Sequence, residues 1–326
     1  MSSDEFDIIK RYFAPLAKDE AARGLLDDAA VLAAQGRVVV TTDTIVEGVH
    51  FLPDDPIQFV AKKALRVNLS DLAAKGAEPI GVLLALSWPD MKPTREIARF
   101  AEGLKEDLDF YKAPLIGGDT TSTSGPLTIT ITALGAPYGP RVPARADAVV
   151  GDDVWVTGVI GDAWLGLQAR RGPLPPLDTN ESATLARRYQ VPEPPVSFAA
   201  AIARSANASM DVSDGLLTDA KKIASASKVR VRLEAAAAPL SDLAQRWLSG
   251  AGLARRVELL SGGDDYQILF TAPQRARAEI LGSGEGLAIR VTRIGSVEAG
   301  EGVALMDEAG AEVAVLATGY RHKLGR

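Results

Sequence analysis

Two hydrophobic periodicities alternate in the first half of the chain and limit it to folds that pack helices against sheets. Residues 126–135 read PLTITITALG, so Leu127, Ile129 and Ile131 fall on one face of a predicted strand and threonines on the other. Residues 37–44, RVVVTTDT, predict a second strand. Between these strands, apolar residues recur every three or four positions, which predicts one helix from Pro56 to just before Gly76 and another over residues 94–111.

The length and the second half of the sequence predict a second domain. A chain of 326 residues exceeds the roughly 100–200 residues typical of one domain. Apolar patterning lapses over residues 139–153, and we set the domains at 1–143 and 144–326. The second half predicts strands at 154–158, 229–234 and 266–271 and a helix at 217–227. The mixture favours an α+β class for both domains.

Composition excludes several classes of function. With 47% hydrophobic and 24% charged residues the chain has the balance of a soluble globular protein, and a net charge of −6 disfavours nucleic acid as a partner. The sequence contains no cysteine, which excludes thiolate chemistry and is compatible with a reducing cytoplasm. The N-terminus lacks the pattern of a signal peptide, and the longest apolar run, residues 79–89, is far shorter than the roughly 18 residues of a membrane span. We therefore expect a cytoplasmic protein with no membrane partner.

Aspartate stands beside a predicted strand end, a glycine or a hydroxyl residue at six places. Any single one could be a turn or a helix cap. Asp71 lies in an apolar stretch, where a salt bridge to a neighbouring lysine or arginine is the alternative explanation. No such base neighbours Asp43 or Asp119, so we predict that the carboxylates gather around Mg²⁺, Ca²⁺ or Mn²⁺. The six places hold Asp27 and Asp28, Asp43, Asp71, Asp119, Asp211 and Asp214, and Asp264 and Asp265.

The glycines of LIGGDTTSTSGP, residues 115–126, predict a loop whose backbone N–H groups hold a phosphate while Asp119 holds the cation. The segments DVSDG and SGGDDY repeat this design in the second half. The sequence contains neither a Walker A motif nor a protein-kinase glycine loop. His50 and His322 are its only histidines, so mechanisms that need several imidazoles are excluded.

The segments TTDTIVEGVHFLP, ALRVNLSDLAAKGAEP, LIGGDTTSTSGPLTIT, DVSDGLLTDA and SGGDDYQILFT resemble the thiamine-monophosphate kinase family, in order over nearly the whole chain. The resemblance implies a two-domain aminoimidazole ribonucleotide synthetase-like α+β fold, with mixed sheets packed by helices and a sheet-mediated homodimer. It further implies an N-terminal domain that binds ATP and Mg²⁺ and dimerises, and a C-terminal domain that completes the active site. The implied reaction is direct, Mg²⁺-assisted, in-line phosphoryl transfer from ATP to thiamine monophosphate, giving thiamine diphosphate, with several Mg²⁺ ions and no general base.

The resemblance also assigns roles to individual residues. Asp43, Asp71, Asp119 and Asp211 would assist the transfer through bound metal. Substrate positions match His50, Asp264 and Tyr320. ATP positions match Gly118, Asp119, Arg145 and Ser213. The metal ligands match Asp28, Thr41, Thr42, Asp43, Asp71, Asp119, Asp211 and Asp214.

Two residues depart from the family pattern, and other functions stay open. Leu26 stands where the family has glycine, and Asp264 stands where it usually has glutamate. The sister selenophosphate and hydrogenase-maturation enzymes depend on cysteine or selenocysteine, which this chain lacks. Aminoimidazole ribonucleotide synthetase lacks the sequence motif NLSDLAAKG of residues 68–76. The alternative from another class is a non-catalytic protein that binds a divalent metal or a nucleotide.

Overall fold

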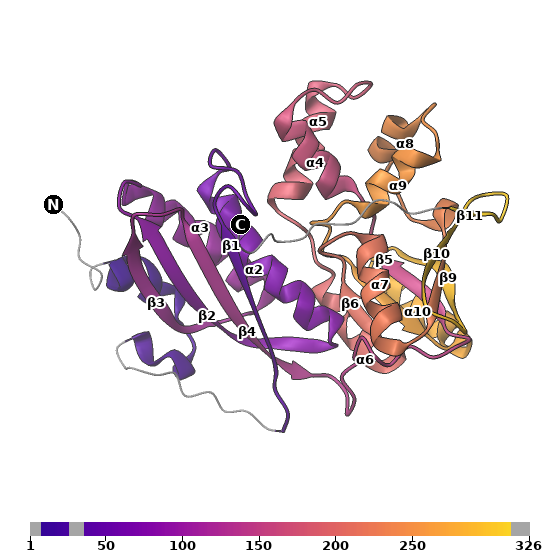
Figure 1. The fold of residues 1–326 in the computed structure, drawn as a ribbon. Coiled ribbons are helices and arrows are strands. Elements are labelled where there is room, and N and C mark those ends of the chain that lie inside the picture. The colour runs from indigo at the N-terminus through magenta and orange to yellow at the C-terminus, as the bar shows by residue number, and fades with distance from the viewer. Residues whose placement is uncertain (1–7, 26–35, 314–326) are drawn as a thin grey trace. The chain divides into compact units, whose positions relative to one another are not determined.

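The structure is a computed structural model that describes residues 8–25 and 36–313 and divides the chain into two compact units. Unit 1 comprises Met1–Leu72 and Ala77–Pro137, and unit 2 comprises Ala73–Gly76 and Tyr138–Arg326. Each unit contains its own sheet with helices packed against it (Figure 1). The predicted α+β class is therefore confirmed.

Unit 1 is a four-stranded sheet with two long helices. The strand order is β1-β4-β2-β3, in which β4 runs antiparallel to both of its neighbours and β3 runs parallel to β2. The elements of this unit are β1 (Val39–Val46), α2 (Ile57–Ala74), β2 (Ala77–Pro89), α3 (Arg95–Tyr111), β3 (Leu115–Thr123) and β4 (Thr128–Pro137). Short π and 3-10 turns precede them at Ile9–Phe13, Ala14–Leu16 and Glu20–Leu25.

The two faces of this sheet differ in chemistry. Helix α3 packs on one face through Phe100, whose ring meets Trp88 of β2 edge-on at 6.3 Å. The opposite face carries rows of hydroxyls, in which the side chains of Thr42 and Thr132 lie 3.0 Å apart and those of Thr44 and Thr130 lie 2.7 Å apart. The strict alternation of β4 thus separates an apolar face from a hydroxyl-rich face, as the sequence predicts.

Unit 2 is a seven-stranded mixed sheet in the order β11-β10-β7-β9-β5-β8-β6, in which β10 and β7 are parallel and the other pairs are antiparallel. Its strands are β5 (Asp153–Thr157), β6 (Ser209–Asp211), β7 (Arg230–Glu234), β8 (Ile268–Ala272), β9 (Val291–Glu298), β10 (Gly302–Met306) and β11 (Glu312–Val313). Its helices are α4 (Asp162–Arg171), α5 (Thr179–Gln190), α6 (Ala199–Ser205), α7 (Leu216–Ser227), α8 (Asp242–Leu248), α9 (Leu253–Ser261) and α10 (Arg277–Gly286). Short 3-10 turns lie at Val196–Phe198, Ala235–Ala237 and Gln274–Ala276.

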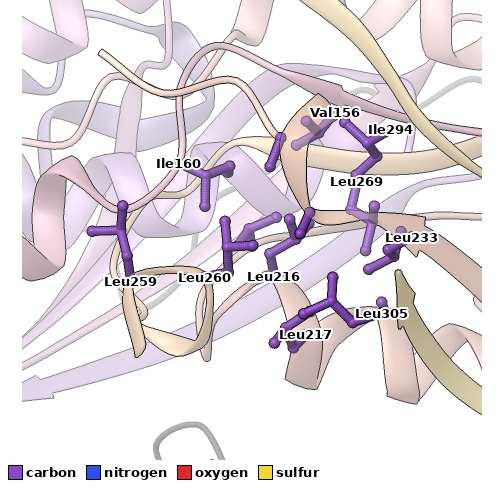
Figure 2. Packing of buried hydrophobic residues seen from close by; sticks show 14 of the residues in the cluster. Val156, Ile160, Leu216, Leu217, Leu233, Leu259, Leu260, Leu269, Ile294 and Leu305 are labelled. Carbon is purple, nitrogen blue, oxygen red and sulfur yellow. The ribbon is translucent and has the colours of Figure 1, made fainter. Parts of the chain in front are cut away.

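Apolar clusters cover both faces of the unit 2 sheet. On one face, Val156 of β5 and Leu269 of β8 pack with Leu216 and Leu217 of α7 and with residues of α9 (Figure 2). On the other face, Trp155, Ile268 and Phe270 pack with α6 and α10. Every residue of β5 and β8 is buried, which fits strands covered on both sides. This core fixes the position of β6, which carries Asp211.

The glycine stretch after residue 115 differs from its prediction, because it is strand β3 rather than a loop. Its glycines permit close packing: a Cβ atom built on Gly118, which has a φ of +155°, would lie 1.9 Å from the carbonyl oxygen of Leu84 on the neighbouring strand. No helix within the described part of the chain is long and apolar enough to span a bilayer.

We expect Gly103→Ala to destabilise unit 1, although alanine normally stabilises a helix interior relative to glycine by up to about 1 kcal/mol. A Cβ atom at Gly103 of α3 would lie 2.3 Å from the carbonyl oxygen of Gln58 in α2, so the helices would have to separate. Overpacking of this kind costs about 1–3 kcal/mol. Urea unfolding measures the change, and Glu102→Ala, at an exposed position of the same helix, is the matched control. A Gly103→Ala variant more stable than the native chain would contradict this packing.

Candidate active site

In unit 1, helix α2 and strand β1 hold two carboxylates near each other. The Thr41 hydroxyl donates to Oδ2 of Asp71 at 2.5 Å, and the backbone N–H of Asp43 donates to Oδ1 of Asn68 at 3.0 Å. Asn68 is fully buried and three residues before Asp71, so both side chains leave α2 on the side that meets β1. The structure therefore brings together Thr41, Asp43 and Asp71 of the predicted ligand set.

Among residues 8–25 and 36–313, no lysine or arginine forms an ion pair with either carboxylate of this pair. Restricted hydration, as the larger cause, and the negative charge of Asp71 together raise the pKa of Asp43 to about 6. The surface of Asp43 is nevertheless partly open to solvent, so an added cation can reach it. Two neighbouring carboxylates supply hard oxygen donors of the kind that Mg²⁺ binds, and waters and substrate phosphates usually fill the rest of its coordination shell.

The predicted alternative for Asp71, a salt bridge to a nearby base, is wrong within the described residues, where its hydrogen-bond partner is the hydroxyl of Thr41. The bases that neighbour Asp71 in the sequence all bind other groups. Lys62 pairs with Glu106, Lys63 donates to the carbonyl of His50, Arg66 pairs with Asp107 and Lys75 donates to the carbonyls of Pro143 and Ser209.

Two further residues of the predicted set lie elsewhere in unit 1. The Thr42 hydroxyl faces the hydroxyl-rich side of the sheet and contacts Thr132. Asp119 is exposed on β3, opposite Ala85, and β3 and β1 are the two outer strands. By register, Asp119 shares the face of Thr44, whereas Asp43 points to the other face. Unit 1 of a single chain therefore does not bring Asp119 to the Asp43–Asp71 pair.

His50 follows β1 in a tight turn. The Nδ1 atom of the His50 ring accepts the backbone N–H of Val46 at 3.0 Å, and the backbone N–H of His50 donates to the Val46 carbonyl. Because Nδ1 is an acceptor, the proton of the neutral ring lies on Nε2. The turn is braced by Lys63, which is 1% exposed and donates to the His50 carbonyl at 2.9 Å.

In unit 2, two predicted segments lie side by side as hydrogen-bonded loops. Asp211 ends β6 and is 5% exposed, and the loop that follows runs to Gly215. The N–H of Asp264 donates to the carbonyl of Ser213, and the N–H of Tyr266 donates to that of Val212, each at 2.8 Å. The structure thus places the segments that carry Asp211, Ser213, Asp214 and Asp264 next to one another.

The glycines of these loops stand where the two loops meet. A Cβ atom at Gly263 would lie 2.2 Å from the carbonyl of Ser213, and one at Gly215 would lie 2.4 Å from that of Ser261. They permit close contact between the two loops. The N–H groups of Ser213 and Asp214 both bind the carboxylate of Asp219 at 3.0 Å, so the prediction that this loop offers them to a phosphate is wrong for these two groups.

Asp219 and Lys222, both on α7, hold the loop and were not predicted. Burial raises the pKa of the fully buried Asp219 to about 6, against the opposing effect of Lys222. Burial alone would lower the pKa of Lys222, but the charges of Asp219 and Asp214 raise it above its ordinary value. The available signal was the spacing of Asp219 and Lys222, which places an acid and a base on one helix face.

The second aspartate of SGGDDY is structural. Asp265 accepts the N–H of Gly161 at 2.8 Å and that of Ala163 at 3.3 Å, and so caps the start of α4 from a distant segment. Burial raises the pKa of Asp265 well above its ordinary value. Asp264, the predicted substrate contact, is half-buried, has a φ of +70° and accepts from the Tyr266 hydroxyl at 3.1 Å.

The remaining predicted residues are exposed or outside the described ranges. Arg145 is exposed, and within the described chain its guanidinium has no hydrogen bond or ion pair, while its carbonyl accepts from Ser227 at 2.8 Å. Asp28 and Tyr320, together with Leu26, lie outside the described residues. Across residues 8–25 and 36–313, no three histidine, aspartate or glutamate side chains form a group that could hold a metal. Among the predicted metal ligands, the Asp43–Asp71 pair offers donors that fit Mg²⁺.

The two units match two family models. Residues 26–136 match the N-terminal domain of AIR synthase related proteins, and residues 149–308 match the C-terminal domain. The chain is 44% identical to the thiamine-monophosphate kinase of Caulobacter vibrioides over 305 residues, which cover 92% of this chain and 85% of that protein.

Solved structures agree with this match. The thiamine-monophosphate kinase of Stenotrophomonas maltophilia superimposes with a TM-score of 0.81 at 37% identity, over 94% of this chain and 97% of the other. The structure of AaThiL complexed with AMPPCP and TMP superimposes with a TM-score of 0.78 at 30% identity, over 98% and 97% of the two chains.

The Asp43 carboxyl group should titrate with a midpoint near pH 6 in the metal-free protein. Asp71→Asn removes one of the two causes and should lower the midpoint, while restricted hydration keeps it above the ordinary value. Carboxyl ¹³C NMR measures both midpoints. Exposed Asp90→Asn is the control and should leave the Asp43 midpoint unchanged. An Asp43 midpoint that does not respond to Asp71→Asn would show that the two carboxylates do not interact.

Proposed function

Because the chain belongs to the thiamine-monophosphate kinase family of AIR synthase related proteins, we propose that it transfers the γ-phosphoryl group of ATP to the phosphate of thiamine monophosphate. The products are thiamine diphosphate and ADP. The observation that carries this proposal is the 44% identity to a thiamine-monophosphate kinase over 92% of this chain. The AaThiL complex with AMPPCP and TMP, which aligns over 98% of this chain, supports the same pair of ligands.

The reaction requires positioning and charge neutralisation rather than a general base. An oxygen of the acceptor phosphate, already ionised near neutral pH, forms a bond to the γ-phosphorus, and the bond from that phosphorus to the β–γ bridging oxygen breaks. The main barrier is repulsion between the two phosphates, about 4 kcal/mol per pair of unit charges at ~4 Å in a protein-like medium. Bound Mg²⁺ supplies the opposing charge in such transfers.

The residues of this chain divide these tasks. Asp43 and Asp71 would hold Mg²⁺ with their carboxylates, while the Thr41 hydroxyl orients the Asp71 carboxylate and Asn68 fixes the backbone of Asp43 through its N–H group. The exposed guanidinium of Arg145 binds the phosphates of ATP. His50 contributes to the thiamine monophosphate site as a neutral ring protonated on Nε2. By the family pattern, Asp119, Asp211 and Asp28 would be further metal ligands.

Purified protein incubated with ATP, Mg²⁺ and thiamine monophosphate should form thiamine diphosphate, detected by chromatography with fluorescence. Omission of Mg²⁺ should abolish the product. An excess of other phosphate acceptors in the same assay tests specificity. Binding of ATP with no product under any metal condition would contradict the proposal and favour a non-catalytic nucleotide-binding protein.

Variants of the proposed ligands extend the same assay. Asp71→Asn and Asp119→Asn should each lower kcat/KM by at least about a hundredfold, since each removes a ligand for the Mg²⁺ whose positive charge offsets the repulsion between the phosphates. Asp90→Asn changes an exposed aspartate outside the proposed site and should leave the rate within twofold. Near-normal rates in both ligand variants would contradict the assignment of these two residues.

We propose further that the enzyme is a cytoplasmic homodimer. The chain contains no cysteine, which fits a reducing compartment. In unit 1 the two outer strands and the hydroxyl-rich face give a second copy a surface to cover, including Val40, which is 60% exposed. The proposed ligand Asp119 lies on that face, apart from Asp43.

Light scattering coupled to size exclusion should give a mass of two chains, each of 34.3 kDa. Val40→Glu introduces a charge on the exposed part of β1 and should shift the mass toward the monomer. Met91→Glu, at a position that is 93% exposed in the loop after β2, is the matched control. A native chain that stays monomeric at the concentrations of the kinase assay would contradict the dimer.

A further inference from the structure

Lys222 binds Asp214, a predicted metal ligand on the loop before α7 in unit 2. Its Nζ donates to Oδ2 of Asp214 at 2.6 Å and to Oδ1 of Asp219 at 2.7 Å. The Lys222 side chain is 34% exposed and that of Asp214 is 32% exposed. A cation therefore already occupies one side of the Asp214 carboxylate.

The position of this ammonium group is fixed from the buried side. Asp219 is fully buried and is held through its other oxygen by the N–H groups of Ser213 and Asp214. Lys222 follows Asp219 by three residues, so the α-helix itself sets their spacing. Because the Asp219 carboxylate is locked, the ammonium that bridges it to Asp214 is held in place as well.

This arrangement does not fit a metal ion at Asp214. A divalent cation on the same carboxylate would meet a fixed positive charge a few ångströms away. Among residues 8–25 and 36–313, Asp214 also belongs to no group of three acidic or histidine side chains that could hold a metal ion. The Asp43–Asp71 pair differs because no base binds either carboxylate in the described chain.

We propose that Lys222 supplies the positive charge at Asp214 in place of a metal ion, so that this chain binds no metal through Asp214. The inference rests on the proposed function for its setting, since Asp214 is a ligand position of the family pattern. Lys222 then acts as a positioning residue, which holds the loop that carries Ser213 without a bound ion.

Mn²⁺ binding to the full chain, counted by electron paramagnetic resonance of free Mn²⁺, tests the inference without a measurement of activity. Asp214→Asn should leave the number of bound ions and their Kd within twofold of the native values. Lys222→Met should add one Mn²⁺ site or tighten binding at least fivefold, because it leaves Asp214 and Asp219 without a cation. The double variant Asp214→Asn with Lys222→Met should lose that gain.

Lys221→Met is the matched control, because Lys221 is exposed on the same helix and its loss changes the net charge by the same amount. It should not alter Mn²⁺ binding. Thermal unfolding of every variant verifies that each is folded, and Lys222→Gln replaces Lys222→Met should the latter fail to fold. Lys222→Arg keeps the charge and should bind Mn²⁺ like the native chain.

Two results would overturn the inference: loss of one Mn²⁺ or a tenfold weaker Kd in Asp214→Asn, or no gain in the folded Lys222 variant. Formation of thiamine diphosphate by the native chain is measured separately. A native chain that forms product while Asp214→Asn loses an ion would refute this inference alone. A chain that gains the ion in Lys222→Met but forms no product would refute the proposed function alone.

Discussion

The repulsion between Asp43 and Asp71 is the interaction on which the chemistry of unit 1 depends. Strand β1 and helix α2 hold the two carboxylates together through Thr41 and Asn68, while the neighbouring bases bind other groups. Such an arrangement disfavours the metal-free folded state, because the protein keeps an unneutralised charge where hydration is restricted. A divalent cation at the proposed site would relieve that repulsion, so the folding of the unit would provide part of the free energy of metal binding.

In unit 2, two irregular loops approach each other closely. Gly215 and Gly263 stand where any side chain would collide with a carbonyl group, and the loops exchange backbone hydrogen bonds as strands do. The Asp219 carboxylate then binds two N–H groups that the turn leaves without carbonyl partners. Local rigidity therefore comes from backbone contacts and one buried carboxylate, before any ligand is bound.

Periodicity predicted the regular elements well, because side-chain burial follows the helix or strand repeat directly. Helix α2 at Ile57–Ala74 and strand β4 at Thr128–Pro137 lie where the pattern placed them. The role of a glycine is harder to predict. In β3 and around Gly263 glycine permits close packing, and a sequence does not distinguish this role from phosphate binding. Contacts between distant segments, such as Asp265 with Gly161, are set by tertiary packing, and so no local pattern indicated them.

The ion pair on α7 has a consequence for the evolution of this loop. Replacement of Lys222 alone leaves two acidic groups uncompensated, and replacement of Asp214 alone leaves an ammonium group with one partner in place of two. The two electrostatic penalties are coupled, because both changes alter the environment of the same ammonium group. Selection would therefore act on positions 214 and 222 together.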